Sequence, residues 1–303
     1  MNSDRRGVST NHSEGQEVRK AVLYTTHRFG AAVAGRFRRL LREAPADYEV
    51  FLALDVSSAG QAESDRARET AGDRLFAFQP SELADSPYPH PWTLPGSRDL
   101  VPGNLGLLHL HFAERQGEFD RIWALEYDVC YTGHWGTLLS SFEGSSADVL
   151  GTTLQTRRDR PDWDWWPSLR PTAEIPFEEC IRGFFPVLRI SRRALDVLDT
   201  AYSGGWSGHF EAVLPTAARQ AGLEIEDLGG DGPFVRPENR NRHYTNSPLR
   251  QGLCPGTFVY RPARRFPGLR RNKLWHPIKP TAGRIAPYLK MAGEHVRAHL
   301  PHS

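Results

Sequence analysis

The hydrophobic pattern divides the first half of the chain into short apolar runs separated by amphipathic stretches. Apolar runs of strand length occupy residues 19–26, 48–56, 74–78, 121–129 and 147–153. The first of these runs is continuous and ends in polar residues, as in a strand buried on both faces of a parallel sheet. The Pro-rich passage at residues 80–102 predicts a loop between the third and fourth strands.

Helical spacing fills the gaps between these runs. Over residues 31–44 one helical face is formed by apolar side chains at i, i+4, i+7 and i+8, namely Val33, Phe37, Leu40 and Leu41. Pro45 ends this helix, and Gly117 ends a second one expected at residues 105–116. Strands that alternate with helices require crossover connections, so the sequence predicts an α/β fold with a Rossmann-related, mostly parallel sheet and helices on both faces.

The second half of the chain has a different pattern. Residues 162–166 (D-W-D-W-W) predict an aromatic loop, and residues 231–255 predict a long irregular segment. Between them we expect a strand at 183–190, a helix capped by Ser191, a helix at 207–222 that Pro215 kinks or restarts, and a strand at 223–228. The chain contains no internal repeat.

Polar side chains follow three of the predicted strands at the point where each strand ends. They are His27, Asp55 and the pair formed by Glu126 and Asp128. In open α/β sheets, ligands bind at the carboxyl ends of the strands. We therefore expect these four side chains to lie near one ligand-binding edge.

Glu126 and Asp128 are two carboxylates separated by one residue, which places both on the same face of a strand. Close carboxylates repel unless a cation lies between them, and Mg²⁺ binds through one or two carboxylates together with substrate phosphates. The pair therefore favours a metal-bridged phosphate ester or diphosphate. The alternative is a solvated strand end without a ligand.

The order of several short motifs resembles a known family. L-A-L-D-V-S-S-A-G at 52–60, G-N-L-G at 103–106, G-E-F-D at 117–120 and W-A-L-E-Y-D-V at 123–129 follow one another at spacings similar to those of GT-A type nucleotide-diphosphosugar transferases. The closest similarity is to family-2-like glycosyltransferases. The chain also resembles uncharacterised transferase-like proteins whose acid motif reads E-Y-D-V and is followed by a Gly-Trp turn, here G-H-W-G at 133–136.

The resemblance implies a GT-A-like fold and assigns residues to the donor. It implies that Asp55 contacts the base or ribose, that Asn104 belongs to the nucleotide-binding part with His27, and that Glu126 and Asp128 hold Mn²⁺ or Mg²⁺ against the diphosphate. The first acid is Glu where the family usually has Asp, which leaves open which of the two carboxylates ligates directly.

The segment L-W-H-P-I-K at 274–279 carries two further candidates. His276 matches the C-terminal histidine that completes the metal site in many GT-A enzymes, and Lys279 is a candidate for phosphate contact. The alternative for His276 is a hydrogen-bonded histidine of a surface loop.

An inverting transfer requires a general base beside the acceptor hydroxyl. Glu211 is the first candidate and His209 the second, because W-S-G-H-F-E at 206–211 lies where the family has an acid-bearing helix start. The alternative is that an acid near a helix N-terminus only complements the helix dipole.

Two further segments have open interpretations. The aromatic loop at 162–166 is either a platform for a sugar ring or part of the core. The segment from Arg261 to Lys273 has six basic residues in thirteen, a density compatible with peripheral membrane contact or a nucleic-acid patch. It is also compatible with a solvated surface or a basic wall facing the diphosphate.

Composition narrows the class of protein. A formal net charge of +2 implies no strong attraction to polyanions, so no nucleic-acid partner is expected. Three dispersed cysteines argue against a disulfide framework and suit the cytoplasm. Residues 1–18 read as a disordered tail, 19–285 as one catalytic domain with nucleotide-binding (19–155) and acceptor-binding (156–285) halves, and 286–303 as a C-terminal helix or tail.

The sequence thus predicts a metal-dependent, inverting glycosyltransferase that moves a sugar from a nucleotide-diphosphosugar donor to a carbohydrate or other hydroxyl acceptor. Two alternatives stay open. One is a metal-dependent nucleotidyltransferase or hydrolase that uses the same acids, and the other is a noncatalytic nucleotide- or carbohydrate-binding protein on the same scaffold.

Overall fold

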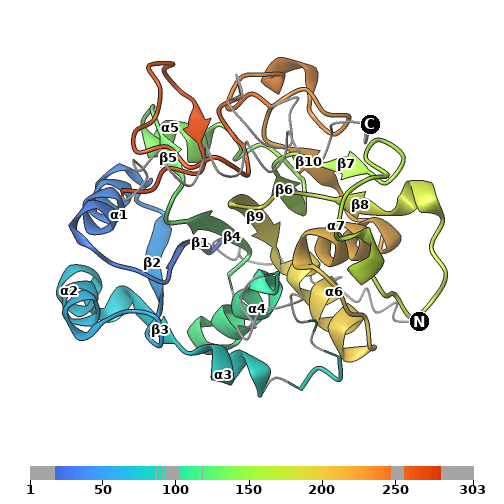
Figure 1. Ribbon diagram of the computed structural model, residues 1–303, viewed down its shortest axis with the longest axis horizontal. Coiled ribbons are helices and arrows are strands. Elements are labelled where there is room, and N and C mark those ends of the chain that lie inside the picture. The colour runs from blue at the N-terminus through green and yellow to red at the C-terminus, as the bar shows by residue number, and fades with distance from the viewer. Residues whose placement is uncertain are drawn as a thin grey trace, which may run out of the picture.

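The computed structural model describes residues 18–85, 87–90, 92, 103–117, 119–246 and 256–280. Its centre is a seven-stranded sheet in the order β10-β6-β9-β4-β1-β2-β3 (Figure 1). The strands of this sheet are β1 (Lys20–Thr26), β2 (Tyr48–Asp55), β3 (Leu75–Phe78), β4 (Arg121–Glu126), β6 (Val149–Gly151), β9 (Val187–Ser191) and β10 (Ile225–Asp227). Strand β9 runs antiparallel to both neighbours and the other pairs are parallel. The predicted mostly parallel α/β sheet is confirmed.

Helices and short two-stranded pairings complete the described part of the fold. The helices are α1 (Ala31–Glu43), α2 (Gln61–Ala71), α3 (Pro80–Ala84), α4 (Leu105–Gln116), α5 (Trp135–Ser140), α6 (Arg192–Ser203) and α7 (Phe210–Gln220). The 3-10 turns are η1 (Gly72–Arg74), η2 (Trp166–Ser168), η3 (Phe177–Glu179) and η4 (Pro237–Asn239). Two small antiparallel pairs join β7 (Gln155–Thr156) to β8 (Ile181–Arg182), and β5 (Cys130–Tyr131) to β11 (Leu274–Trp275). Among the described residues, no helix is both long and apolar enough to cross a bilayer.

Side chains of the central strands alternate between two cores because successive residues of a strand point to opposite faces. The first core holds Ala21, Leu23, Phe51, Ala53, Ile122 and Ala124. The second holds Val22, Tyr24, Leu52, Leu54, Trp123 and Leu125. Helices α4, α6 and α7 cover the first core and α1 and α5 the second, on opposite sides of the sheet (Figure 1). The continuous apolar runs are therefore strands buried on both faces, and helices on both faces are confirmed.

The boundaries of most helices and strands agree with those predicted from the sequence. They differ where backbone groups form other hydrogen bonds. The helix expected at 105–116 is α4 with the same bounds. The Pro-rich passage was predicted to be loop throughout, and this is wrong at α3, where Pro80 occupies the first turn and Gln79 and Glu82 form a capping box. The predictions for residues 1–17, 286–303 and Cys254 lie outside the described residues.

Helix α7 runs through Pro215 without a break, contrary to the expected kink or restart. A proline has no N–H, so the carbonyl of Glu211 four residues earlier loses its helical donor. The N–H of Gly183 donates to this carbonyl instead, at 2.8 Å. The helix before it begins as predicted, since the hydroxyl of Ser191 accepts the N–H of Ala194 at 3.1 Å.

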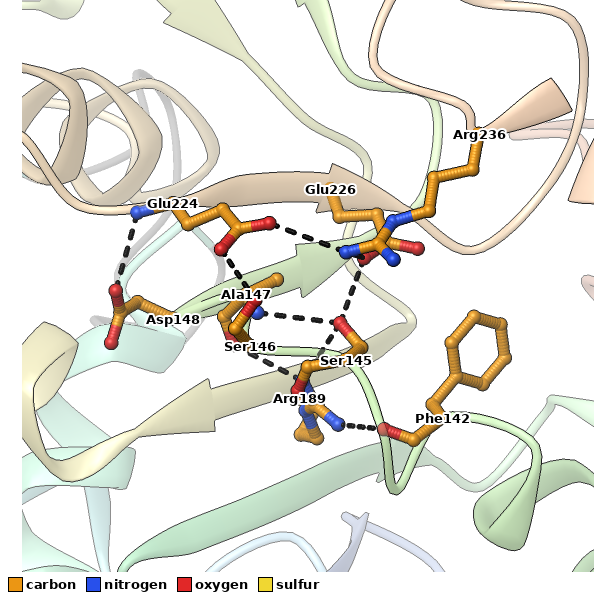
Figure 2. Close-up of polar contacts among 9 residues, drawn as sticks. All are labelled: Phe142, Ser145, Ser146, Ala147, Asp148, Arg189, Glu224, Glu226 and Arg236. Atoms are coloured by element: carbon orange, nitrogen blue, oxygen red, sulfur yellow. Dashed lines mark hydrogen bonds and ion pairs between the residues drawn. The ribbon is translucent and has the colours of Figure 1, made fainter.

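At the amino end of β6, one buried arginine closes the preceding loop. The Arg189 guanidinium is 2% exposed and points from β9 into the loop at 142–147 (Figure 2). It donates to the carbonyls of Phe142, Ser145 and Ala147 at 2.6, 2.9 and 3.1 Å. Burial lowers the pKa of Arg189 to about 10, so the side chain keeps its charge at neutral pH. The nearby Glu226 accepts from the Ser145 hydroxyl and pairs with Arg236 at 3.0 Å.

Replacing this arginine tests how much the loop depends on it. Arg189→Leu leaves three buried carbonyls without their donor, and we expect it to lower the free energy of unfolding by about 3 kcal/mol. Urea denaturation of both proteins measures the difference. The control, Arg115→Leu, removes an exposed arginine at the end of α4 and is expected to change stability by less than about 0.5 kcal/mol. Equal losses in the two variants would contradict the assigned role of Arg189.

Candidate metal and catalytic site

Strand β4 ends at Glu126, earlier than the sequence predicts, and the chain turns at once. The turn is closed by the N–H of Val129, which donates to the Glu126 carbonyl at 3.0 Å. Glu126 therefore ends the strand and Asp128 lies in the turn, so the two carboxylates do not share a strand face as expected. The Glu126 side chain is one third exposed, while that of Asp128 is only 4% exposed. The two acids thus occupy different environments.

A segment far along the chain docks beside this turn. Leu274 pairs with Tyr131 and Trp275 with Cys130 in the β5–β11 pair, immediately after the acids. The next residues continue along the turn, since the N–H of Ile278 donates to the Asp128 carbonyl at 2.7 Å. This antiparallel register brings the residues that follow β11 next to Asp128.

His276 is the residue that this register delivers to the acids. Its Nε2 lies 3.3 Å from Asp128 Oδ1 and 3.9 Å from Glu126 Oε2. On the other side of the ring, Nδ1 lies 2.7 Å from the carbonyl of Val259. A hydrogen bond from Nδ1 to a carbonyl fixes the tautomer that presents Nε2 as a ligand, as is common for metal-binding histidines. The predicted grouping of Glu126, Asp128 and His276 is present in the structure.

The charges of this group act strongly on one another. Burial and the neighbouring Asp128 carboxylate raise the pKa of Glu126 to about 7. Burial opposes ionisation of Asp128, but His276 and Lys279 outweigh it and hold the pKa of Asp128 below its usual value. Burial likewise opposes the charge on His276, yet Asp128 and Glu126 raise its pKa. Lys279, whose Nζ lies 3.4 Å from Asp128 Oδ2, has its pKa raised by the same carboxylate against the effect of burial.

The donor set fits a divalent cation. One ligand atom from each of Glu126, Asp128 and His276 lies within 4.8 Å of the others. Asp128 Oδ1 is buried and accepts no hydrogen bond from the described residues. A buried carboxylate oxygen without a donor is costly, and a cation beside it removes that cost. A set of two carboxylates and one imidazole suits Mn²⁺ or Mg²⁺, whereas soft metals favour thiolate ligands.

Arg36 of α1 joins the two halves of this group, and it is not among the residues predicted from the sequence. Its guanidinium donates to the carbonyl of Tyr127 at 3.1 Å and to that of Ile278 at 2.8 Å. One carbonyl belongs to the acid turn and the other to the docked segment. The signal in the sequence is slight, because Arg36 is one of several arginines on a helix whose other face is apolar.

Glu211, the predicted base, lies on the second residue of α7 with its side chain 18% exposed. Its Oε1 accepts the N–H of Phe185 at 2.9 Å, while Oε2 lies 3.8 Å from His209 Nδ1, too far for a hydrogen bond. Burial raises the pKa of Glu211 to about 7. The Glu211 carboxylate also contributes to the raised pKa of Glu126, after burial and the other nearby charges, so the two carboxylates repel each other.

Residues 183–186, predicted as the start of a strand, instead form a bridge between the base and the acid turn. The ring of Phe184 packs edge-on against His276 with centroids 5.2 Å apart. Phe185 donates its N–H to Glu211, and Pro186 accepts the N–H of Glu126 at 2.9 Å. Three consecutive residues thus touch the base, the metal-site histidine and the end of β4. The strand begins only at Val187 because the preceding backbone groups serve these contacts.

His209 is held among aromatic rings. It stacks on Trp165 with centroids 5.7 Å apart and planes 15° apart, and it contacts Trp92 and Trp163. Its Nδ1 accepts the N–H of Glu211 at 3.3 Å, which caps α7, and burial together with Arg182 lowers the pKa of His209 to about 4. A histidine with this pKa is a weaker base than Glu211 at neutral pH.

The aromatic loop contributes mainly to packing. Trp163 and Trp166 are buried in a small third core cluster, while Trp165 is only partly buried. The sequence did not single out Trp92, whose partners are Trp165 and His209. Trp92 and Trp165 both contact His209, the residue that caps α7 two positions before Glu211.

The predicted donor-binding residues lie at the carboxyl edge of the sheet. Asp55 is buried and accepts hydrogen bonds from the N–H and hydroxyl of Ser57, at 2.9 and 2.7 Å, and from the hydroxyl of Ser58 at 2.8 Å. His27 is exposed at the end of β1, with its ring edge-on to Tyr127. Desolvation and the cations Arg28 and Lys279 lower the pKa of His27.

Asn104 lies beside Trp92, close to the first residue of α7. It is buried at the start of α4, and its amide donates to the Trp92 carbonyl. The carbonyl of the preceding Gly103 accepts the N–H of Phe210 at 2.7 Å, next to Glu211. The role of Asn104 in donor binding stays a prediction, as do those of Asp55, His27 and Lys279.

Comparison with known proteins gives similar folds. No protein-family model matches the chain, and no curated protein matches it. An active-site mutant of the galactosyltransferase LgtC is 13% identical, over 90% of this chain and 95% of that chain, with a TM-score of 0.45. Mouse xyloside xylosyltransferase 1, in its apo form, is 14% identical over 71% and 87% of the two chains, with a TM-score of 0.39.

A mannosyltransferase from Pyrobaculum calidifontis, solved with GDP-Man and Mn²⁺, is 13% identical over 68% of this chain and 53% of that chain, with a TM-score of 0.37. Cytidylyltransferases also occur among the similar folds. One fold can carry several activities, so the function is argued below from the side chains of the site.

Metal binding is tested without any assay of activity. Titration of the wild-type chain with MnCl₂, followed by calorimetry, is expected to show one binding event, which Asp128→Asn weakens roughly tenfold or more because a charged ligand is lost. Asp73→Asn removes an exposed carboxylate in η1, at the other edge of the sheet, and is expected to leave the affinity unchanged. Equal affinities in all three proteins would place the bound cation elsewhere.

Proposed function

We propose that this chain is a divalent-metal-dependent glycosyltransferase that moves a sugar from a nucleotide-diphosphosugar donor to an acceptor hydroxyl with inversion. The observation that carries the proposal is the Glu126–Asp128–His276 group, in which Asp128 and His276 are buried, together with the largely buried Glu211 carboxylate, whose Oε1 is held by the N–H of Phe185. An inverting transfer needs charge neutralisation at the leaving group and a base at the acceptor, and these two groups match those needs.

On the donor side, a bound Mn²⁺ or Mg²⁺ supplies charge neutralisation for the departing nucleoside diphosphate. Glu126, Asp128 and His276 would hold the ion, and Lys279, which lies beside Asp128, would support the same diphosphate with its ammonium group. When the bond between the anomeric carbon and the diphosphate oxygen breaks, its electron pair stays on the diphosphate. We place Asp55 and His27 on the nucleoside side because they lie at the carboxyl ends of β2 and β1, the two strands that follow β4 in the sheet order.

On the acceptor side, Glu211 acts as the base. Phe185 holds Oε1, which leaves Oε2 to take the proton from the acceptor hydroxyl as its oxygen bonds to the anomeric carbon. A buried carboxylate with a pKa of about 7 accepts a proton more readily than an exposed one. The partly buried Trp92 and Trp165 contact His209, which caps the helix of this base, and an aromatic surface there fits the C–H face of a sugar acceptor.

Product analysis separates this activity from its alternatives. With Mn²⁺ and a panel of nucleotide-diphosphosugars, we expect release of nucleoside diphosphate, and Asp128→Ala is expected to lower that rate about a hundredfold or more. Asp73→Ala is the matched control and should keep the rate. Release of inorganic diphosphate from a nucleoside triphosphate and a sugar phosphate would identify a nucleotidyltransferase instead. Donor binding without turnover across an acceptor panel would identify a binding protein.

The dependence of the rate on pH tests Glu211. The base acts in its deprotonated form, so kcat should be constant above pH 7 and fall about tenfold per unit below it, following the pKa of about 7. Glu211→Gln should lower kcat by roughly 10²–10⁴-fold and remove this limb, with Mn²⁺ affinity retained. Glu178→Gln, an exposed neighbour in η3, should keep the wild-type profile. A full acid limb in Glu211→Gln would assign the base to another group.

A further inference from the structure

The loop at residues 260–273, here called the basic loop, exposes large hydrophobic side chains. Tyr260 is 60% exposed, Phe266 is 69% exposed and Leu269 is fully exposed. These are three of the five exposed large hydrophobic residues in the described part of the chain. Scattered exposed hydrophobics are ordinary, but a group at one loop marks an interaction surface.

The same loop concentrates positive charge. It contains six basic residues and no acidic one. Four of its arginines are exposed and form no ion pair with a carboxylate of the described residues: Arg261, Arg265, Arg270 and Arg271. Two of these guanidinium groups lie over exposed rings, Arg261 at 5.0 Å from the Tyr260 centroid and Arg265 at 5.4 Å from that of Phe266. Cationic and apolar groups are therefore interleaved along one surface.

The base of the loop is fixed to the body of the protein. Gly268 lies so close to Trp275 that an added Cβ would be 2.2 Å from its ring. The N–H of Arg264 donates to the Pro277 carbonyl at 2.9 Å, and the Thr132 hydroxyl donates to the Arg270 carbonyl at 2.6 Å. The exposed side chains are thus presented from an anchored backbone, and binding through them requires little ordering of the chain.

We propose that the basic loop docks the protein on a membrane surface that contains anionic lipid. Phe266 and Leu269 enter the boundary between headgroups and acyl chains, while the neighbouring arginines meet lipid phosphates. A nucleic acid would use the arginines but offers nothing to a fully exposed leucine. This surface goes beyond the proposed activity, since it involves neither the metal ligands nor Glu211.

The loop also lies next to the site along the chain. His276 and Lys279 follow it within a few residues, and the Lys279 N–H donates to the Arg264 carbonyl at 2.8 Å. Docking through Phe266 and Leu269 therefore holds the segment that carries His276 and Lys279 close to the lipid surface. A transferase held in this way acts on acceptor hydroxyls at that surface.

Vesicle flotation with the full chain tests the proposal. Wild-type protein is expected to float with vesicles of equal parts phosphatidylcholine and phosphatidylglycerol, and to stay behind with phosphatidylcholine alone. The double variant Phe266→Ser/Leu269→Ser and the double variant Arg270→Gln/Arg271→Gln are each expected to lower partitioning tenfold or more, as an estimate of order of magnitude. The matched controls are Phe177→Ser, which removes another exposed ring, and Arg74→Gln/Arg115→Gln, which removes two exposed arginines at the amino edge of the sheet.

Circular dichroism of each variant, with the wild-type spectrum expected, shows that a loss of binding is not a loss of folding. The proposal is overturned if the wild-type protein does not bind anionic vesicles. It is also overturned if both loop variants still bind, or if the control variants lose binding to the same extent. An oligonucleotide mobility shift that needs Arg270 and Arg271 but not Phe266 and Leu269 would replace the membrane with a nucleic acid. Self-association abolished by Phe266→Ser/Leu269→Ser, without vesicle binding, would replace it with a second copy of the chain.

Discussion

The candidate site depends on one small antiparallel pairing, that of β5 with β11. It joins Cys130–Tyr131, directly after the acid turn, to Leu274–Trp275, directly before His276. Without it, His276 would not be held beside Asp128, because β4 and the turn after it contribute only the two acids of the group. The pairing spans more than half the described chain, so the entropy of closing that loop is offset by burial of Leu274 and Trp275 and by the arginine clamp on Tyr127 and Ile278.

A second constraint places the base relative to the metal group. Gly183 donates to the Glu211 carbonyl that Pro215 leaves without a helical donor, and Phe185 donates to the Glu211 side chain. The proline therefore does not break α7, because its missing N–H is replaced by that of Gly183, in the irregular stretch whose Pro186 also contacts the end of β4. Backbone groups of this one short stretch donate to the helix carbonyl and to the carboxylate, and the stretch ends beside the acid turn. Their geometry explains why this stretch is irregular just before β9, where the sequence pattern alone favours a continuous strand.

The predictable parts are those where the side chain itself decides the structure. Apolar periodicity located β1, α1, β2 and α4 within a residue or two, and the strand ends located the two acids at the carboxyl edge of the sheet. His276 was found through a resemblance and not through spacing. Arg36, Trp92 and the bridging role of Phe184 and Phe185 were not found, because each acts through contacts between segments remote in sequence. Backbone donors and acceptors carry most of those contacts, and they leave no trace in residue type.

Charged side chains are distributed unevenly over this surface, although the formal net charge is only +2. Arginines on the helices have partners one turn away or on a neighbouring element, such as Arg39 with Glu43, Arg192 with Asp196 and Arg219 with Glu179. The basic loop has no acid of its own, so its guanidinium groups meet solvent beside bare hydrophobic side chains. The near-neutral total argues against attraction to polyanions by the whole molecule, yet one face can bind an anionic surface because screening confines such attraction to about 10 Å. Local composition at an anchored loop, and not the total, determines what this protein can touch.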